Sequence, residues 1–327
     1  MDALMQWGIL AILSVQSVPG LTGVMHFFSF LGREEFFLFF IPAIYWCVDA
    51  KLGARLAVVL IASNALNILL KAAFHLPRPY WIDLRVKALS AELSYGLPSG
   101  HAMNATAVWG FLASQVRKGW VWAVLAALVL MISLSRLYLG VHFPTDVLTG
   151  WVFGALLLGL FLAVERPVAA RLRRLSMGRQ IGLALVVSLL YFTLFSGILT
   201  AIGPTPDPAS WERNAAVSIS AKTGRPATDP RNPKDGSAAA GLILGLGLAF
   251  ALGSRGETRL ETRGPLARKG LRFAVGMAGV LLFWLGLKAA APAEPAAIAV
   301  AFRYLRYALA IFWALHLAPR VFVKLKL

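Results

Sequence analysis

The 327-residue chain is 58% hydrophobic and 14% charged, with a mean hydropathy of +0.70. This composition is too apolar for a soluble globular domain, in which apolar residues usually make up about half of the sequence. The single cysteine, Cys47, excludes a disulfide framework and a multi-cysteine metal site. The net charge of +17 is spread over short connections between apolar segments, so we expect no nucleic-acid partner.

The first apolar stretch, at residues 4–17, ends at Pro19-Gly20. It is short for a membrane span, which needs about 20 residues. We therefore expect an N-terminal interfacial segment over residues 1–33, with a helix that lies along the membrane surface.

The following apolar segments predict an all-α, polytopic membrane bundle of about nine transmembrane helices. Six of these segments form a predicted core over residues 34–202, and three form a C-terminal extension over residues 238–327. A polar, Pro-rich loop at 203–237 separates the two parts. The predicted spans are 36–48, 56–74, 101–116, 120–139, 144–164, 181–202, 238–252, 271–290 and 296–317.

The positions of Lys and Arg predict the orientation of the bundle. Alternate connections are basic, most densely between Arg166 and Arg179, whereas the charges of the 203–237 loop nearly balance. Because an excess of Lys and Arg marks cytoplasmic loops, we expect an integral protein of the cytoplasmic (inner) membrane with the 203–237 loop on the extracytoplasmic, periplasmic side. Gly241 and Gly245 predict close helix packing, within the chain or in a homodimer.

Three polar clusters fall on the extracytoplasmic side of this arrangement. Lys71 and Arg78 lie at the outer end of the second predicted span, and the run 98–101, Pro-Ser-Gly-His, precedes the third. The free backbone N–H groups of a helix start favour an anion, and a glycine there lets the anion approach closely. The third cluster, 135–146, joins the fourth and fifth spans.

These clusters together indicate a phosphate site. The cations Lys71, Arg78 and Arg136 are costly at membrane depth unless they share an anion, and arginine matches phosphate oxygens bidentately. His101 and His142 add an acid and a nucleophile. Asp146 follows His142 by four residues, so its carboxylate can hold one ring nitrogen while the other attacks phosphorus.

The three clusters resemble the signature of the type 2 phosphatidic acid phosphatase superfamily, K-x6-R-P, P-S-G-H and S-R-x5-H-x3-D, with the membrane lipid phosphatases as the most similar branch. The matching residues are Lys71, Arg78, Pro79, Pro98, Ser99, Gly100, His101, Ser135, Arg136, His142 and Asp146.

The resemblance implies a phosphatase that works without a metal or another cofactor. In that family His142 would form a phosphohistidine, His101 would protonate the leaving oxygen, and Asp146 would orient His142. The implied phosphate ligands are Lys71, Arg78, Ser99, Gly100 and Arg136.

The resemblance also implies a phosphorylated lipid as substrate, such as phosphatidate, phosphatidylglycerophosphate or a polyprenyl pyrophosphate, that enters from the surrounding membrane lipids. The nine-span layout and the string 78–81, Arg-Pro-Tyr-Trp, are also similar to animal glucose-6-phosphatases, whose substrate is a sugar phosphate. Asp146 favours the lipid branch, because those enzymes do not keep an aspartate at that position. The same scaffold is also compatible with a lipid phosphotransferase, or with a non-catalytic lipid-binding or transport protein.

Overall fold

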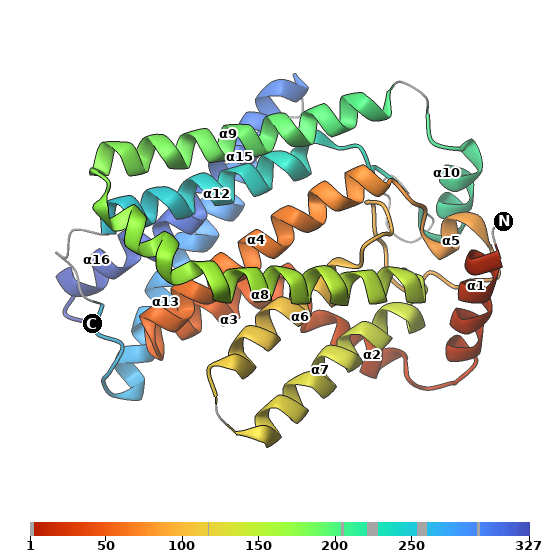
Figure 1. The fold of residues 1–327 in the computed structure, drawn as a ribbon, viewed down its shortest axis with the longest axis horizontal. Coiled ribbons are helices and arrows are strands. Elements are labelled where there is room, and N and C mark those ends of the chain that lie inside the picture. Colours follow the sequence, from red (N-terminus) through yellow and green to blue (C-terminus); the bar gives the residue numbers. More distant parts are fainter. Residues whose placement is uncertain (1–2, 117, 204–205, 221–227, 254–259, 293–294) are drawn as a thin grey trace. The chain divides into compact units, whose positions relative to one another are not determined.

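The computed structural model describes residues 3–116, 118–203, 206–220, 228–253, 260–292 and 295–327. Over these residues every regular element is a helix (Figure 1), which confirms the all-α prediction. In chain order they are α1 (Ala3–Gln16), α2 (Thr22–Phe30), α3 (Glu34–Cys47), α4 (Ala50–Phe74), α5 (Pro79–Ile82), α6 (Gly100–Ser114), α7 (Gly119–Tyr138), α8 (Pro144–Arg174), α9 (Met177–Ile202), α10 (Ala209–Ala215), η1 (Ala216–Ser220), α12 (Pro233–Gly253), α13 (Leu266–Leu281), η2 (Leu282–Gly286), α14 (Leu287–Ala290), α15 (Ala296–Phe312), η3 (Trp313–Leu317) and α16 (Ala318–Lys324).

Among the described residues, seven helical segments are long and apolar enough to cross a membrane. The chain is therefore a polytopic helical membrane protein, as predicted. The predicted spans at 36–48 and 101–116 correspond to α3 and α6, which have 14 and 15 residues. These are shorter than the roughly 20 residues that cross a bilayer unaided, so the count of about nine stays a prediction.

The helix boundaries differ from several predicted spans, and two of these differences change the connections between helices. The arginine-rich connection is helical for most of its length, because α8 runs on through Pro167 to Arg174 and α9 begins at Met177. Arginine is a good helix former, so a helix can continue after its sequence stops being apolar. The polar 203–237 loop contains α10 and η1, and α12 already begins at Pro233. Residues 204–205 and 221–227 of that loop lie outside the described residues.

The chain divides into two compact units. Unit 1 consists of Met1–Phe36, Leu66–Leu160 and Gly197–Asn232, and unit 2 of Phe37–Ala65, Phe161–Ser196 and Pro233–Leu327. Helices α3, α4, α8 and α9 contribute residues to both units.

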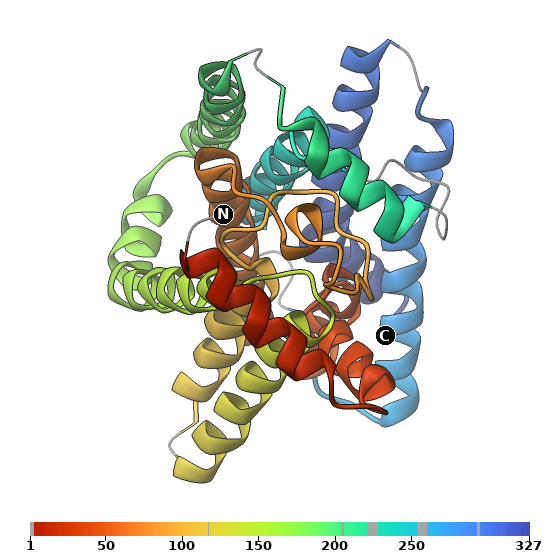
Figure 2. The same ribbon diagram turned by 90° about the vertical axis from the view of Figure 1, so that its right-hand side faces the viewer.

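The N-terminal helices belong to the core of unit 1. Ile9 and Ile12 of α1 are fully buried in a cluster that includes Trp81 and Tyr138, whereas Trp7 on the opposite face is exposed. Both α1 and α2 lie against α7 (Figure 2). The segment is therefore amphipathic, as an interfacial helix would be, and one of its faces supports the rest of the unit.

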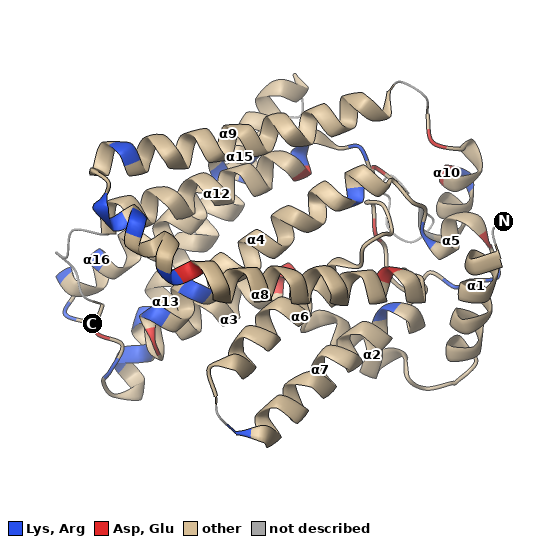
Figure 3. Ribbon diagram, in the orientation of Figure 1, with Lys and Arg blue, Asp and Glu red and all other residues tan. Residues whose placement is uncertain are grey.

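In unit 2, α12 and α15 pack closely through small residues. A Cβ atom at Gly241 would lie 2.2 Å from the Tyr304 carbonyl oxygen, and one at Gly245 would lie 2.2 Å from that of Ala308. This glycine face is thus covered within the chain and is not available for a homodimer contact. Basic residues gather at one end of the unit, at the end of α8 and at the starts of α9 and α13 (Figure 3).

Candidate active site

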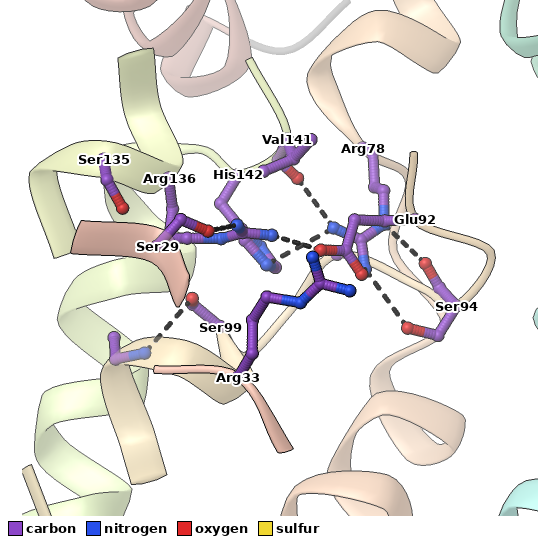
Figure 4. A network of polar contacts seen from close by, with 12 residues as sticks. Ser29, Arg33, Arg78, Glu92, Ser94, Ser99, Ser135, Arg136, Val141 and His142 are labelled. Atoms are coloured by element: carbon purple, nitrogen blue, oxygen red, sulfur yellow. Dashed lines mark hydrogen bonds and ion pairs between the residues drawn. The ribbon is translucent and has the colours of Figure 1, made fainter. Parts of the chain in front are cut away.

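The site lies in unit 1, where the ends of α4, α6, α7 and α8 meet the irregular segment 83–99 (Figure 4). Every site residue predicted from the sequence belongs to this unit. Hydrogen bonds to the backbone of the irregular segment bring several of them together.

His142 and Asp146 form the pair that the sequence spacing predicts. His142 lies just before α8, and its Nδ1 is 3.1 Å from Asp146 Oδ2 in the first turn of that helix. The same carboxylate oxygen accepts a hydrogen bond of 2.9 Å from the backbone N–H of Phe143. Because Nδ1 faces a carboxylate, it carries the proton, and Nε2 of His142 keeps its lone pair.

Arg78 holds the other side of His142. Its Nη1 donates to the Val141 carbonyl at 2.8 Å and lies 3.3 Å from His142 Nε2. Its Nε and Nη2 donate to the carbonyls of Ser94 and Tyr95, at 2.6 and 3.1 Å. The side chain is 1% exposed, so these carbonyls fix a buried guanidinium beside the imidazole.

Lys71, in the last turn of α4, is oriented by the same segment. Its Nζ donates to the Tyr95 carbonyl and, at 3.0 Å, to the Gly96 carbonyl. The Tyr95 carbonyl therefore accepts hydrogen bonds from both Lys71 and Arg78. This shared acceptor brings two of the predicted phosphate ligands to one point.

Arg136, near the end of α7, reaches the site from the opposite side. Its Nη1 donates to the Ser29 hydroxyl of α2 and its Nη2 to the Glu92 carboxylate. Its buried Nε has no hydrogen-bond partner among the described residues. The neighbouring Ser135 turns away, because its hydroxyl donates to the Ile132 carbonyl at 2.6 Å.

The start of α6 supplies the remaining predicted residues. Ser99 is the N-cap, fully buried, and its backbone N–H donates to the Asp146 carbonyl at 2.9 Å. A Cβ atom at Gly100 would come within 2.9 Å of Asn67 Oδ1, so only glycine fits without displacing Asn67. His101 Nε2 is buried and has no partner in the part of the chain that the structure describes, which is the arrangement expected of a group that meets a substrate oxygen.

The electric field of the site is set by these cations. Burial lowers the pKa of His142, and Arg78 and Lys71 lower it further. The imidazole is therefore neutral at neutral pH. Burial would raise the pKa of Glu92, but Arg136 and Arg78 outweigh it and lower that pKa to about 2.

Several residues of the site carry no signal in the sequence motifs. Glu92 pairs with Arg136 and lies 3.9 Å from Arg78 Nη2. Ser29 contributes from α2, which falls within the predicted interfacial segment. A carboxylate nine residues before His101, in an otherwise uncharged stretch, was the available hint for Glu92.

The 83–99 segment is braced by residues far along the chain. The Tyr95 hydroxyl donates to Asp207 at 3.0 Å and accepts from Arg231 Nε at 3.0 Å, and Arg231 also pairs with Asp207 at 2.7 Å. Burial, together with Asp207, raises the pKa of Tyr95 to about 12, so the phenol keeps its proton. The backbone N–H of Asp229 donates to the Leu93 carbonyl at 3.0 Å.

Two family descriptions match the chain. Residues 52–168 match the PAP2 superfamily, and residues 237–327 match the transmembrane extension of PAP2 superfamily phosphatases. With the helical fold, these matches define a membrane-embedded phosphatase. The chain belongs to the PAP2 superfamily.

Relatives of two kinds are similar to the chain. Glucose-6-phosphatase 3 of Rattus norvegicus is 28% identical over 314 residues, 88% of this chain and 87% of that protein. Lipid phosphate phosphatase delta of Arabidopsis thaliana is 29% identical over 49% of this chain and 43% of its own length. Sphingosine-1-phosphate phosphatase 2 of Homo sapiens is 33% identical over 42% of this chain and 36% of its own length. The first similarity runs nearly end to end, and the other two are partial.

Proposed function

We propose that this phosphatase hydrolyses phosphate monoesters through a phosphohistidine formed on His142. The observation that carries the proposal is the placement of that imidazole, with Nδ1 at 3.1 Å from Asp146 Oδ2 and Nε2 at 3.3 Å from Arg78 Nη1. A carboxylate that holds Nδ1–H leaves the lone pair of Nε2 for phosphorus, and a guanidinium beside it can hold the phosphoryl oxygens.

The reaction has two steps. Nε2 of His142 bonds to phosphorus as the bond to the leaving oxygen breaks, and His101 donates a proton to that oxygen. Water then attacks the phosphohistidine, His101 takes a proton from it, and inorganic phosphate leaves. The burial of His101 Nε2 without a partner among the described residues supports this role.

Positioned hydrogen-bond donors stabilise the negative charge that develops on the phosphoryl oxygens. Lys71, Arg78 and Arg136 supply positive charge, and the N–H groups of Gly100 and His101 at the start of α6 supply backbone donors. Ser99, as the N-cap, holds that helix start beside Asp146. The three cations give the neutralisation that a divalent ion gives in metal-dependent phosphatases.

This mechanism predicts metal-independent activity that vanadate inhibits. Purified protein assayed for phosphate release should keep its rate within about twofold after EDTA, because cationic side chains carry the charge. Vanadate, which adopts a five-coordinate geometry like that of phosphorus in the transition state, should compete with substrate. A rate that collapses in EDTA and returns with Mg²⁺ or Zn²⁺ would contradict the mechanism.

For the substrate we propose a phosphorylated lipid. The chain is a membrane protein whose relatives include a lipid phosphate phosphatase and a sphingosine-1-phosphate phosphatase. The distribution of basic residues favours an inner-membrane protein whose site faces the periplasm, where a lipid headgroup can reach the site from the leaflet.

A sugar phosphate is the second candidate, and one observation favours it. The similarity to glucose-6-phosphatase 3 covers 88% of the chain and therefore at least part of the C-terminal extension, whereas the lipid phosphatases match less than half of the chain. Asp146 remains the residue that argues for the lipid branch.

A substrate panel separates the two candidates. We expect kcat/KM for phosphatidate, phosphatidylglycerophosphate or a polyprenyl pyrophosphate in mixed micelles to exceed that for glucose 6-phosphate by at least about tenfold, because the apolar part of a lipid adds binding energy. The reverse order would assign the sugar phosphate. Phosphate release without an added alcohol distinguishes hydrolysis from phosphoryl transfer, and turnover of none of these compounds would favour a non-catalytic role.

A further inference from the structure

The carboxylate of Glu92 lies among the cations that we assign to the phosphoryl group (Figure 4). It accepts a hydrogen bond from Arg136 Nη2, and its other oxygen is 3.9 Å from Arg78 Nη2. Lys71 and His101 also contribute to its electrostatic surroundings. Glu92 therefore occupies the centre of positive charge to which a phosphate would bind.

The position of Glu92 is fixed by its backbone. The Tyr80 hydroxyl donates to the Glu92 carbonyl at 2.8 Å, and Tyr80 is fully buried. The side chain beyond this anchor is 27% exposed. The carboxylate can thus change its rotamer at the edge of the site while the backbone stays in place.

Arg136 is engaged through both terminal nitrogens. Nη1 donates to Ser29 and Nη2 donates to Glu92, and only Nε has no partner among the described residues. A bidentate grip on a phosphoryl group needs two of these nitrogens. When Glu92 releases Nη2, a phosphate can accept hydrogen bonds from both Nη2 and Nε of Arg136.

We propose that Glu92 is a positioning residue that holds Arg136 ready in the substrate-free enzyme and competes with the phosphoryl group for it. The proposal rests on the assignment of the phosphate-binding cations in the proposed function. It explains how buried arginines persist without an anion, since an unpaired buried charge is strongly unfavourable. It also assigns Glu92 a part in product release, because its carboxylate regains Arg136 as phosphate leaves.

The test is the isosteric substitution Glu92→Gln, which keeps a hydrogen-bond acceptor and removes the charge. We expect the inhibition constants of inorganic phosphate and of vanadate to fall by about tenfold, the scale of one charge a few ångströms from an anion at the edge of a protein. KM should fall with them, and kcat should fall as well if phosphate release becomes slower. The matched control is Glu212→Gln on the exposed surface of α10, which makes the same charge change away from the site.

Unchanged inhibition constants in Glu92→Gln, or an equal change in Glu212→Gln, would overturn the proposal. Glu92→Asp keeps the charge and should leave the inhibition constants within about threefold of wild type. If both Glu92 variants unfold in detergent while Glu212→Gln stays folded, Glu92 serves stability alone and the proposal also fails.

Vanadate binding distinguishes a failure of this role of Glu92 from a failure of the proposed function. Measured as a rise in melting temperature, it requires no turnover. Wild-type protein that neither releases phosphate nor binds vanadate would reject the phosphatase site itself. Wild-type protein that does both, with Glu92→Gln indistinguishable from it, would reject only the role of Glu92.

Discussion

Replacing His142 by alanine should lower kcat by at least about 10,000-fold, the scale seen when a covalent nucleophile is removed. The phosphoenzyme that wild type forms with a ³²P-labelled substrate, stable to base and labile to acid, should disappear. The fold should survive, because the neighbouring Arg78 keeps its hydrogen bonds to the carbonyls of Val141, Ser94 and Tyr95. Single-turnover kinetics with acid and base quenching measures both effects.

The matched control is His26→Ala. His26 lies on α2 in the same unit and is exposed, so this variant should keep the activity and the phosphoenzyme of wild type. A His142→Ala protein that still carries base-stable label would place the covalent intermediate on another residue.

The second large effect is expected from Asp146→Asn. A neutral amide oxygen accepts hydrogen bonds more weakly than the charged carboxylate oxygen that Nδ1–H of His142 and the N–H of Phe143 share. The amide NH₂ also favours the tautomer with the proton on Nε2, which removes the nucleophilic lone pair. We expect kcat to fall by about 1,000- to 10,000-fold with KM nearly unchanged, as in triads whose orienting carboxylate is lost.

Asp83→Asn is the control for this change. Asp83 lies in the same unit and pairs with the exposed Arg85 at 2.7 Å, so the variant should turn over like wild type. The measurement is a full substrate titration of each variant, which gives both kcat and KM. An Asp146→Asn enzyme with kcat within about tenfold of wild type would show that the aspartate does not set the tautomer of His142.

The helical membrane fold was predictable because long apolar runs have few alternatives in a bilayer. Local features of the fold, such as where a helix ends, were harder to predict from the sequence. The apolar pattern of α8 stops near Val164, yet the helix continues to Arg174, since arginines that leave the membrane still form helix. The short helix α2 has no side-chain cap, and its contact with α7 supports it. Tertiary packing of this kind has no local signature.

Some residues of the site could likewise be predicted from the sequence, and others could not. Lys71, Arg78, His142 and Asp146 could be named from sequence because the spacing between them is fixed by chemistry, and the structure places each in contact with another of them or with a shared carbonyl. Their roles remain predictions. Glu92 was missed because a single carboxylate in a loop has no spacing to test, and backbone acceptors such as the Tyr95 carbonyl leave no trace in a sequence.

The link from Tyr95 to Asp207 and Arg231 bears on how this domain is divided. The segment matched to the PAP2 superfamily ends at residue 168, yet the loop that orients Lys71 and Arg78 is tied to side chains well beyond that limit. Arg136 likewise donates to Ser29, which precedes the matched segment. The segment matched by sequence similarity therefore excludes residues that hold the site in place. We therefore expect activity to require the longer chain, because the motif-bearing segment alone would lack the contacts that hold the predicted site residues in place.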